Sequence, residues 1–306
     1  MSGVNAWVVV GGDAAVGSLI ETARSLGGQV GAVVVGPRVV AETVAAGGVD
    51  RVVWFGEPGG VPVEAYATAV ADVVADVVGD GCVVVLGASR PGDRVLLGAV
   101  AARLVAAVLT EASSVSAGGD GLVVTHAVSG GIAEESVAVV GALALVLDGG
   151  PVPAGGGAVA VEEVAASPLA MTVLETSVSA FERVDLGGAA RVVGVGRGLK
   201  ARGDLAMIEA LAGACRAEVG CSRPVAEGLD WLGRDRYIGV SGQHIAPELY
   251  FAIGISGQLQ HMVGVRGAKT IVAINSDPNA LVFKDADYCL VGDLYQIVPA
   301  LTEVLR

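Results

Sequence analysis

The sequence predicts an α/β protein with two domains, each built on a mainly parallel sheet flanked by helices. Three observations lead to this fold class. A chain of 306 residues is long for a single hydrophobic core. It is 53% hydrophobic but only 4% aromatic, and Val-rich runs broken by glycines are typical of parallel strands buried on both faces. These runs alternate with segments of helical length, and the alternation starts again near residue 190.

The first half of the chain predicts four strands separated by helices. The expected strands are residues 6–10, 30–35, 51–54 and 82–86, and the expected helices are residues 13–25, 38–46, 62–78 and 91–108. After Gly118 the sequence turns to successive apolar runs without a helical segment, which favours an antiparallel extension. The Gly- and Pro-rich segment 148–168 is expected to be a loop.

The second half predicts a doubly wound fold. Its expected strands are residues 190–196, 218–222, 236–242, 248–254, 270–275 and 286–292, with a helix over 205–218. In such sheets, ligands bind beyond the carboxyl ends of the strands. The residues expected at those ends are small or polar: Gly196-Arg197-Gly198, Ser222-Arg223, Ser241-Gly242, Ser256-Gly257, Asn275 and Asp293.

These strand ends predict a crevice for a large dinucleotide. Helices that begin straight after a strand point unpaired N–H groups at the loop, and small residues let a phosphate approach them. Each of the three serines suits either a helix cap or a hydrogen bond to a ligand. The sequence contains no Walker A motif, and "GVGRGLKARG" is not GxGxxG, which weakens the case for an ordinary nicotinamide site.

Composition argues against several other classes of protein. The net charge of −13, without a Lys/Arg cluster, argues against nucleic acid as a partner. Cys82, Cys215, Cys221 and Cys289 lack metal-type spacing, so no metal site is expected, and Cys215 and Cys221 are expected to be reduced core thiols. The first residues lack the basic region of a signal peptide, and no apolar run reaches membrane-spanning length. We therefore expect a cytoplasmic protein without direct membrane insertion.

A long motif in the second half carries a resemblance to a known family. The stretch "PELYFAIGISGQLQHMVGVRGAKTIVAIN" (residues 247–275) resembles the signature of the electron transfer flavoprotein alpha subunit, the FAD-holding chain of a heterodimer. "GVGRGLK" and "GCSRPV" precede it in the family's order and spacing, and the match runs from Arg191 to the C-terminus. The first half resembles the family's N-terminal domain more loosely, through "LGASRPGDRVLLGAVAARL". The resemblance implies an N-terminal domain (1–186) that docks the beta subunit and an FAD-binding domain (187–306). The Gly187-Gly188 pair before Arg191 fits either a hinge between them or a simple turn between elements.

The resemblance also implies one bound FAD and the residues that hold it. Those that match the family's contacts are Arg197, Ser222, Arg223, Ile238, Gly239, Val240, Ser241, Ser256, Gly257, Gln258, Leu259, Gln260, His261, Asn275, and, near the adenosine end, Asp293 and Leu294. In this family His261 would donate to flavin O2, Arg223 would lie over the isoalloxazine, and Ser241 would bond flavin N5. An anionic flavin semiquinone favours a protonated His261. Taken alone, His261 also fits a satisfied core histidine, and Arg223 a solvated surface arginine.

The function implied by the resemblance is that of an electron carrier without a substrate turnover of its own. Its FAD would accept electrons from flavin dehydrogenases, of the acyl-CoA type in fatty acid beta-oxidation, and pass them one at a time to a membrane quinone oxidoreductase. The alternatives are an electron-bifurcating member and, in a different class, a non-redox dinucleotide-binding module. One departure from the family is Val240, which stands where a Gln is common. It predicts a shifted flavin potential and admits a dedicated dehydrogenase as partner.

Overall fold

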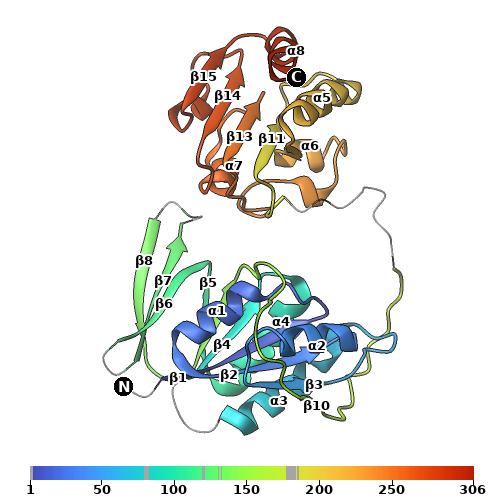
Figure 1. Ribbon diagram of the computed structural model, residues 1–306, viewed down its shortest axis with the longest axis vertical. Helices are drawn as coiled ribbons and strands as arrows, with labels where there is room; N and C mark the ends of the chain where they lie inside the picture. The colour runs from blue at the N-terminus through green and yellow to red at the C-terminus, as the bar shows by residue number, and fades with distance from the viewer. Residues whose placement is uncertain are drawn as a thin grey trace. The chain divides into compact units, whose positions relative to one another are not determined.

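The computed structural model describes residues 3–78, 83–118, 121–129, 131, 133–176, 184 and 186–306. These residues form two compact units (Figure 1). Residues up to 129 together with 133–176 make the first unit, and residues from 184 onward belong to the second. None of the helices within the described residues is long and apolar enough to cross a membrane. The domain boundary expected after residue 186 and the hinge at Gly187-Gly188 stay predictions.

The first unit is built on a seven-stranded sheet whose neighbouring strands run parallel, in the order β10-β3-β2-β1-β4-β9-β5. The four middle strands confirm the prediction: β1 (Val4–Gly11), β2 (Gly27–Val35), β3 (Arg51–Trp54) and β4 (Val83–Ala88). The outer strands are β5 (Ala107–Thr110), β9 (Leu143–Leu147) and β10 (Val161–Glu163). Valine suits the middle positions because both faces of a parallel sheet are buried.

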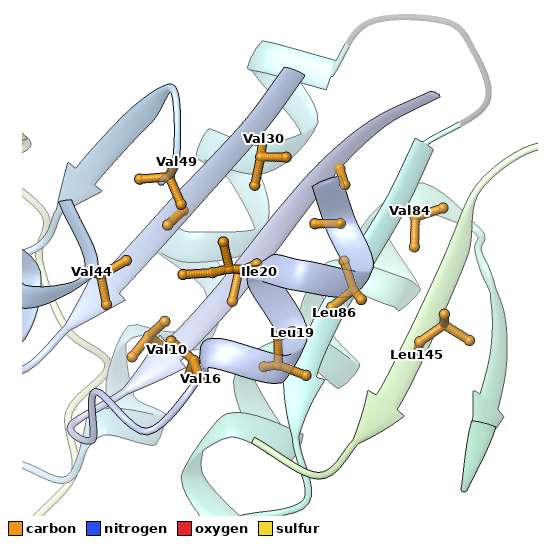
Figure 2. Close-up of a cluster of buried hydrophobic side chains, with 14 of the residues drawn as sticks. Val10, Val16, Leu19, Ile20, Val30, Val44, Val49, Val84, Leu86 and Leu145 are labelled. Carbon is orange, nitrogen blue, oxygen red and sulfur yellow. The ribbon is translucent and has the colours of Figure 1, made fainter. Parts of the chain in front are cut away.

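Helices cover both faces of this sheet, as predicted. They are α1 (Gly17–Ser25), α2 (Arg38–Ala45), the 3₁₀ turn η1 (Val63–Tyr66), α3 (Ala67–Val78) and α4 (Pro91–Leu104). On the face that α1 and α2 cover, Leu19 and Ile20 of α1 lie over the strand valines and Leu86 (Figure 2). Helices α3 and α4 pack on the opposite face. The first unit is therefore a three-layer α/β structure.

Three expectations for the first unit need correction. The helix expected over 91–108 ends at Leu104, because Val105 takes the left-handed conformation (φ 51°) and Ala107 starts β5. The antiparallel strands β6 (Ala112–Gly118), β7 (Gly121–Val128) and β8 (Ala133–Val139) form a sheet of their own instead of extending the main one. The segment 148–168 is not all loop, since β10 pairs there with β3. An ion pair between Arg51 and Glu162, at 2.7 Å, joins these two strands.

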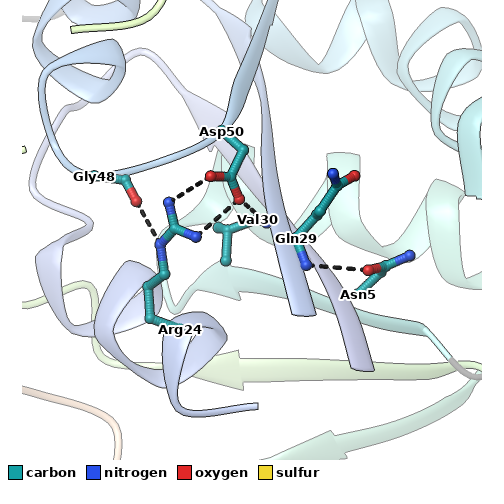
Figure 3. A network of polar contacts seen from close by, with 6 residues as sticks. All are labelled: Asn5, Arg24, Gln29, Val30, Gly48 and Asp50. Atoms are coloured by element: carbon teal, nitrogen blue, oxygen red, sulfur yellow. Dashed lines mark hydrogen bonds and ion pairs between the residues drawn. The ribbon is translucent and has the colours of Figure 1, made fainter. Parts of the chain in front are cut away.

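A polar network ties α1 to the amino ends of the strands (Figure 3). Arg24 on α1 donates to both carboxylate oxygens of Asp50, at 2.8 and 2.9 Å, and to the carbonyl of Gly48. The Asp50 carboxylate also accepts from the N–H of Val30. The hydrogen bonds from Arg24 hold the pKa of Asp50 below its usual value, although burial acts against them. Because each polar group has a partner inside the network, we assign it a structural role.

The second unit contains a five-stranded parallel sheet in the order β12-β11-β13-β14-β15. Its strands are β11 (Arg191–Val195), β12 (Glu218–Cys221), β13 (Leu249–Ile253), β14 (Ile271–Asn275) and β15 (Tyr288–Val291). After β12 the chain crosses β11 to continue with β13, so the strand order reverses at β11. Such a switch point opens a crevice at the carboxyl edge of a doubly wound sheet.

Both faces of the second sheet are covered. Helices α5 (Leu205–Cys215) and α8 (Leu294–Leu305) pack on one face, next to β11 and β13 (Figure 1). Short helical turns and an irregular segment cover the other face, where Ile238, Met262 and Val282 pack on Tyr250 and Ala252 of β13. The remaining short elements are η2 (Arg202–Asp204), α6 (Arg223–Ala226), η3 (Arg234–Arg236), α7 (Leu259–Met262), η4 (Val263–Val265) and η5 (Leu281–Lys284).

Two expectations for the second unit were wrong in detail. Residues 236–242 form a turn and not a strand, with isolated bridges from Tyr237 to Cys221 and from Ile238 to Gln243. Gly239 sits at the turn with a φ of 152°, and the N–H of Val240 donates to the carbonyl of Gln260 at 2.8 Å. The helix expected to reach residue 218 ends at Cys215, because the next residue takes the left-handed conformation.

Candidate functional site

The carboxyl ends of β11, β12 and β13 surround a cavity of about 570 Å³. Most of the residues predicted at the site line it: Arg197, Ser222, Arg223, Val240, Ser241, Ser256, Gln258, Gln260 and His261. They come from four separate loops and from α6 and α7. Gly196, Pro224, Tyr237, Gly254 and Ile255 complete the lining. The fold thus gathers residues that are far apart in the chain around one cavity at the switch point.

A second cavity of about 340 Å³ adjoins the first, because Gly254 lines both. Asn275, Asp293 and Leu294 line it, and these include the two residues expected near the adenosine end. The rest of its lining is Gly198, Lys200, Gly254, Ser276 and Tyr295. Two neighbouring cavities of unequal size suit the elongated shape of a dinucleotide.

Four predicted contact residues do not line either cavity: Ile238, Gly239, Gly257 and Leu259. Ile238 is fully buried in the core beneath. Gly257 is a packing glycine, since a Cβ at this position would lie 1.9 Å from the backbone nitrogen of Val282. For these four residues, direct contact with a cofactor stays a prediction.

Glycines form the floor between the two cavities. A Cβ on Gly196 would lie 2.3 Å from the carbonyl oxygen of Gly254, and a Cβ on Gly198 would lie 2.6 Å from the Cα of Gly254. Gly254 itself has a φ of 61°, which favours glycine. The loops after β11 and β13 therefore meet backbone to backbone. A floor without side chains lets a phosphate group approach main-chain N–H groups.

Two of the serines at the strand ends are not ordinary helix caps. Ser222 is the N-cap residue of α6, but its side chain makes no capping hydrogen bond. The Ser241 hydroxyl lies 3.3 Å from the hydroxyl of Tyr237, and both residues line the larger cavity. The missing cap at Ser222, and the place of both serines in the cavity lining, are compatible with the second of the two predicted roles, which is hydrogen bonding to a ligand.

His261 is buried, with 7% of its surface exposed. Its Nε2 lies 2.7 Å from the hydroxyl of Tyr250, while its Nδ1 is buried and has no hydrogen-bond partner among the described residues. Burial lowers the pKa of His261 to about 4, and the nearby backbone of Ile238, although not in hydrogen-bonding geometry with Nδ1, opposes this shift in part. The imidazole is therefore neutral at pH 7 in this structure. The expected protonated form would need a negative charge supplied by the ligand.

The positive charge of Arg223 is partly compensated by a neighbouring carboxylate. Its side chain is 65% exposed, and its Nε donates to the Glu227 carboxylate at 2.8 Å. Arg234 also lies 3.4 Å from the same carboxylate. Arg197, at the mouth of the cavity, makes no ion pair with any described residue. Arg197 is thus the cation most available to an anionic ligand.

Sequence reasoning missed the tyrosines of the site. Tyr237 lines the larger cavity and Tyr295 lines the smaller one, while the hydroxyl of Tyr250 forms a hydrogen bond with Nε2 of His261. The signal that could have found them is their rarity, because the chain has only five tyrosines. Lys200 was missed as well, although it belongs to the "GVGRGLK" segment; its ammonium lies 4.9 Å from the centre of the Tyr295 ring.

The three cysteines within the described residues do not line either cavity. Cys215 and Cys221 are buried free thiols, as expected, and burial raises the pKa of Cys221 to about 12. Cys289 is free and exposed, and Cys82 lies outside the described residues. Across the part of the chain that the structure describes, no cluster of three or more His, Cys, Asp or Glu residues could hold a metal ion.

Comparison with known families identifies the two halves of the chain. Residues 13–183 match the family model described as the electron transfer flavoprotein domain, and residues 185–266 match the electron transfer flavoprotein FAD-binding domain. Protein FixB of Escherichia coli O157:H7 is 38% identical over 308 residues, which is 98% of this chain and 97% of that protein. The chain belongs to the electron transfer flavoprotein alpha subunit family.

Other relatives of this electron transfer flavoprotein subunit agree. Protein FixB of Shigella flexneri is also 38% identical, over 98% of this chain and 97% of its own length. The putative electron transfer flavoprotein subunit YdiR of Escherichia coli K12 is 60% identical over 131 residues, or 43% of this chain and 42% of that protein. The C-terminal unit is accordingly an FAD-binding domain. The glycine floor, the unpaired Arg197 and the unpartnered Nδ1 of His261 all fit FAD.

Proposed function

We propose that this chain is the alpha subunit of a heterodimeric electron carrier. FAD held by the second unit would accept electrons from a flavin dehydrogenase, of the acyl-CoA type, and deliver them singly to a membrane quinone oxidoreductase by way of an anionic semiquinone. The observation that carries the proposal is the buried, unpartnered Nδ1 of His261 beside a cavity in the family's FAD-binding domain. A buried polar atom without a partner is costly unless a ligand supplies one.

Different residues along the two cavities suit different parts of the FAD molecule. Arg197 and the glycine floor suit the negative pyrophosphate, and Asn275, Asp293 and Leu294 suit the adenosine end. His261 and Arg223 would stabilise negative charge on the isoalloxazine, and Ser241 would donate to its N5. FAD supplies the redox chemistry when bound, and hydrogen bonds and charges near its ring tune the potential.

A second chain is part of the proposal. The YdiR relative is named a subunit, and a carrier that exchanges electrons with large proteins needs its cofactor close to a surface. We therefore infer a beta subunit as the partner that completes the heterodimer, docked on the first unit. A cytoplasmic location is consistent with this function and stays a prediction.

A specific residue favours a dedicated redox partner as the second candidate function. Val240 lines the larger cavity where the family commonly has Gln, so a side-chain amide is missing beside the predicted flavin position. An electron-bifurcating member also remains compatible, since that property depends on the beta chain. A non-redox binding module is less well supported, because a structural site has no need of a buried histidine donor beside the ligand.

The test is a reductive titration of the two-chain complex. The chain is co-expressed with its native beta subunit, and the purified complex is titrated with dithionite while its spectrum is recorded. We expect a red anionic semiquinone to accumulate in the wild type and to accumulate less in His261→Gln. His244→Gln is the matched control, because His244 is exposed and lines neither cavity. An intact complex that goes straight to the fully reduced flavin would support the structural module instead.

A further inference from the structure

We propose that Tyr250 is a positioning residue that keeps His261 neutral with its proton on Nδ1, so that the ring nitrogen without a partner among the described residues is always a hydrogen-bond donor. The inference rests on the proposed function, because it takes FAD as the ligand of the larger cavity. It adds to that function a residue that touches no ligand and decides which atom of His261 carries the proton.

The contact between the two side chains is short and buried. Tyr250 lies on β13 opposite Val192 of β11, and its side chain is fully buried. Its hydroxyl is 2.7 Å from Nε2 of His261, which belongs to α7. The two rings are tilted by 37° with their centroids 6.1 Å apart, so they meet edge to edge through this hydrogen bond and do not stack.

The direction of the hydrogen bond follows from counting protons. The phenol has one proton to donate, and within the described residues Nε2 of His261 is the acceptor in reach of that hydroxyl. If Nε2 carried a proton and donated it instead, the phenol proton would be left buried without an acceptor, which is unfavourable. Burial keeps the phenol protonated by raising the pKa of Tyr250 far above its usual value. Tyr250 therefore donates, and the ring proton of His261 sits on Nδ1.

The same bond disfavours the imidazolium form of His261. An imidazolium needs protons on both nitrogens, but the Nε2 lone pair is already engaged by the Tyr250 hydroxyl. This constraint acts in the same direction as burial. The Nδ1–H group is left without a partner among the described residues, and His261 lines the cavity, so this is the group that the side chain can offer to a carbonyl oxygen that gains negative charge, as at the pyrimidine edge of a reduced flavin. His261 then stabilises that charge by a neutral hydrogen bond.

Gly194 on β11 makes room for the Tyr250 hydroxyl. A Cβ at Gly194 would lie 2.0 Å from the hydroxyl oxygen and 2.5 Å from the ring carbon that bears it. Because both atoms belong to a ring held in a packed core, even alanine at this position would push the hydroxyl away from His261. The position of the proton donor thus depends on a glycine 56 residues before Tyr250 in the chain.

Nitrogen NMR of histidine reads the tautomer directly. The alpha chain, labelled with ¹⁵N only in histidine, is assembled with the unlabelled beta chain. The alpha chain has three histidines, and His261→Gln assigns the signal of interest. For the wild type at pH 7 we expect Nδ1 to show the shift of a protonated nitrogen and Nε2 that of an unprotonated, hydrogen-bonded one. In Tyr250→Phe we expect a mixture of tautomers. Tyr237→Phe removes a hydroxyl that bonds Ser241 instead, and should leave the His261 tautomer unchanged.

The outcomes separate this inference from the proposed function. A wild-type His261 protonated on Nε2, or on both nitrogens at pH 7, overturns the role given to Tyr250, as does an unchanged tautomer in Tyr250→Phe. If Tyr250→Phe does not yield a folded complex, the wild-type spectrum still decides the proton position, and Gly194→Ala displaces the same hydroxyl. FAD content is read from the visible spectrum of the same samples. A complex without FAD counts against the proposed function, whereas a complex with FAD and the wrong tautomer counts only against Tyr250.

Discussion

The burial of a neutral His261 predicts that acid weakens the folded state, and that His261→Gln removes this weakness. Burial lowers the pKa of His261 from 6.5 to about 4. The unfolded chain therefore binds the proton more tightly than the folded one, so the stability is fully present above about pH 6.5 and is lost as the pH falls toward 4. A shift of this size costs about 2 kcal/mol of unfolding free energy between about pH 7.5 and pH 5. Glutamine keeps a hydrogen-bonding group but cannot be protonated in this range.

The assay is urea unfolding of the FAD-free two-chain complex at several pH values within that range, followed by circular dichroism. Other groups titrate as well, so the informative quantity is the difference between wild type and variant at each pH. We expect that difference to change by about 2 kcal/mol in favour of the variant on acidification. The exposed His244, changed to Gln, serves as the control and should leave the wild-type slope intact. Parallel curves for wild type and His261→Gln would refute the reasoning, because they would mean that His261 is not held neutral by burial.

Three further outcomes are expected. Glu227→Gln leaves Arg223 without its partner at 2.8 Å, so the midpoint potential of the bound flavin should rise, and the rise should shrink with added salt because Arg223 is exposed; a potential that does not move contradicts this. Val240→Gln should shift the potential in the same redox titration, and an unchanged value would remove the case for a dedicated partner. Asp93→Ala removes one of the two carboxylates that pair with Arg90, the other being Asp13, and leaves the N–H of Gly11 without its acceptor at a fully buried site; it should lower stability by about 2 kcal/mol in urea unfolding. Asp72→Ala, which breaks an exposed pair with Arg103, should be nearly neutral.

The alternation of strands and helices could be predicted from the sequence because it depends on local patterns. Val-rich runs and the glycines that end them mark β1 to β4 and β11 to β15 without any knowledge of contacts. The secondary-structure predictions were wrong where contacts between residues far apart in the chain determine the structure. Residues 236–242 have the apolar character of a strand, but the N–H of Val240 pairs with Gln260 instead of with a sheet neighbour. Strand β10 has a weak local signal, and it is defined by its backbone pairing with β3, where Glu162 meets Arg51 from 111 residues away.

Much of the candidate site was predictable for a related reason. Ligand-facing residues follow the strands directly, so placing the strands also places Arg197, Ser222, Ser256 and Asn275 at one edge. What the sequence does not show is how charges and protons are shared inside the site. Arg223 pairs with Glu227, and the four-residue spacing between them, which is typical of an ion pair along a helix, is visible in the sequence. The bond between His261 and a tyrosine on a different element depends on packing that no local pattern predicts.

The visible spectrum of the purified alpha–beta complex tests most directly whether a flavin lies beside His261 and Arg223. The complex is incubated with excess FAD, passed through a gel-filtration column and scanned. We expect one FAD to stay with each complex and to give a yellow protein whose flavin bands differ from those of free FAD. A complex that leaves the column colourless would contradict FAD binding in the cavity and, with it, the roles assigned to both residues.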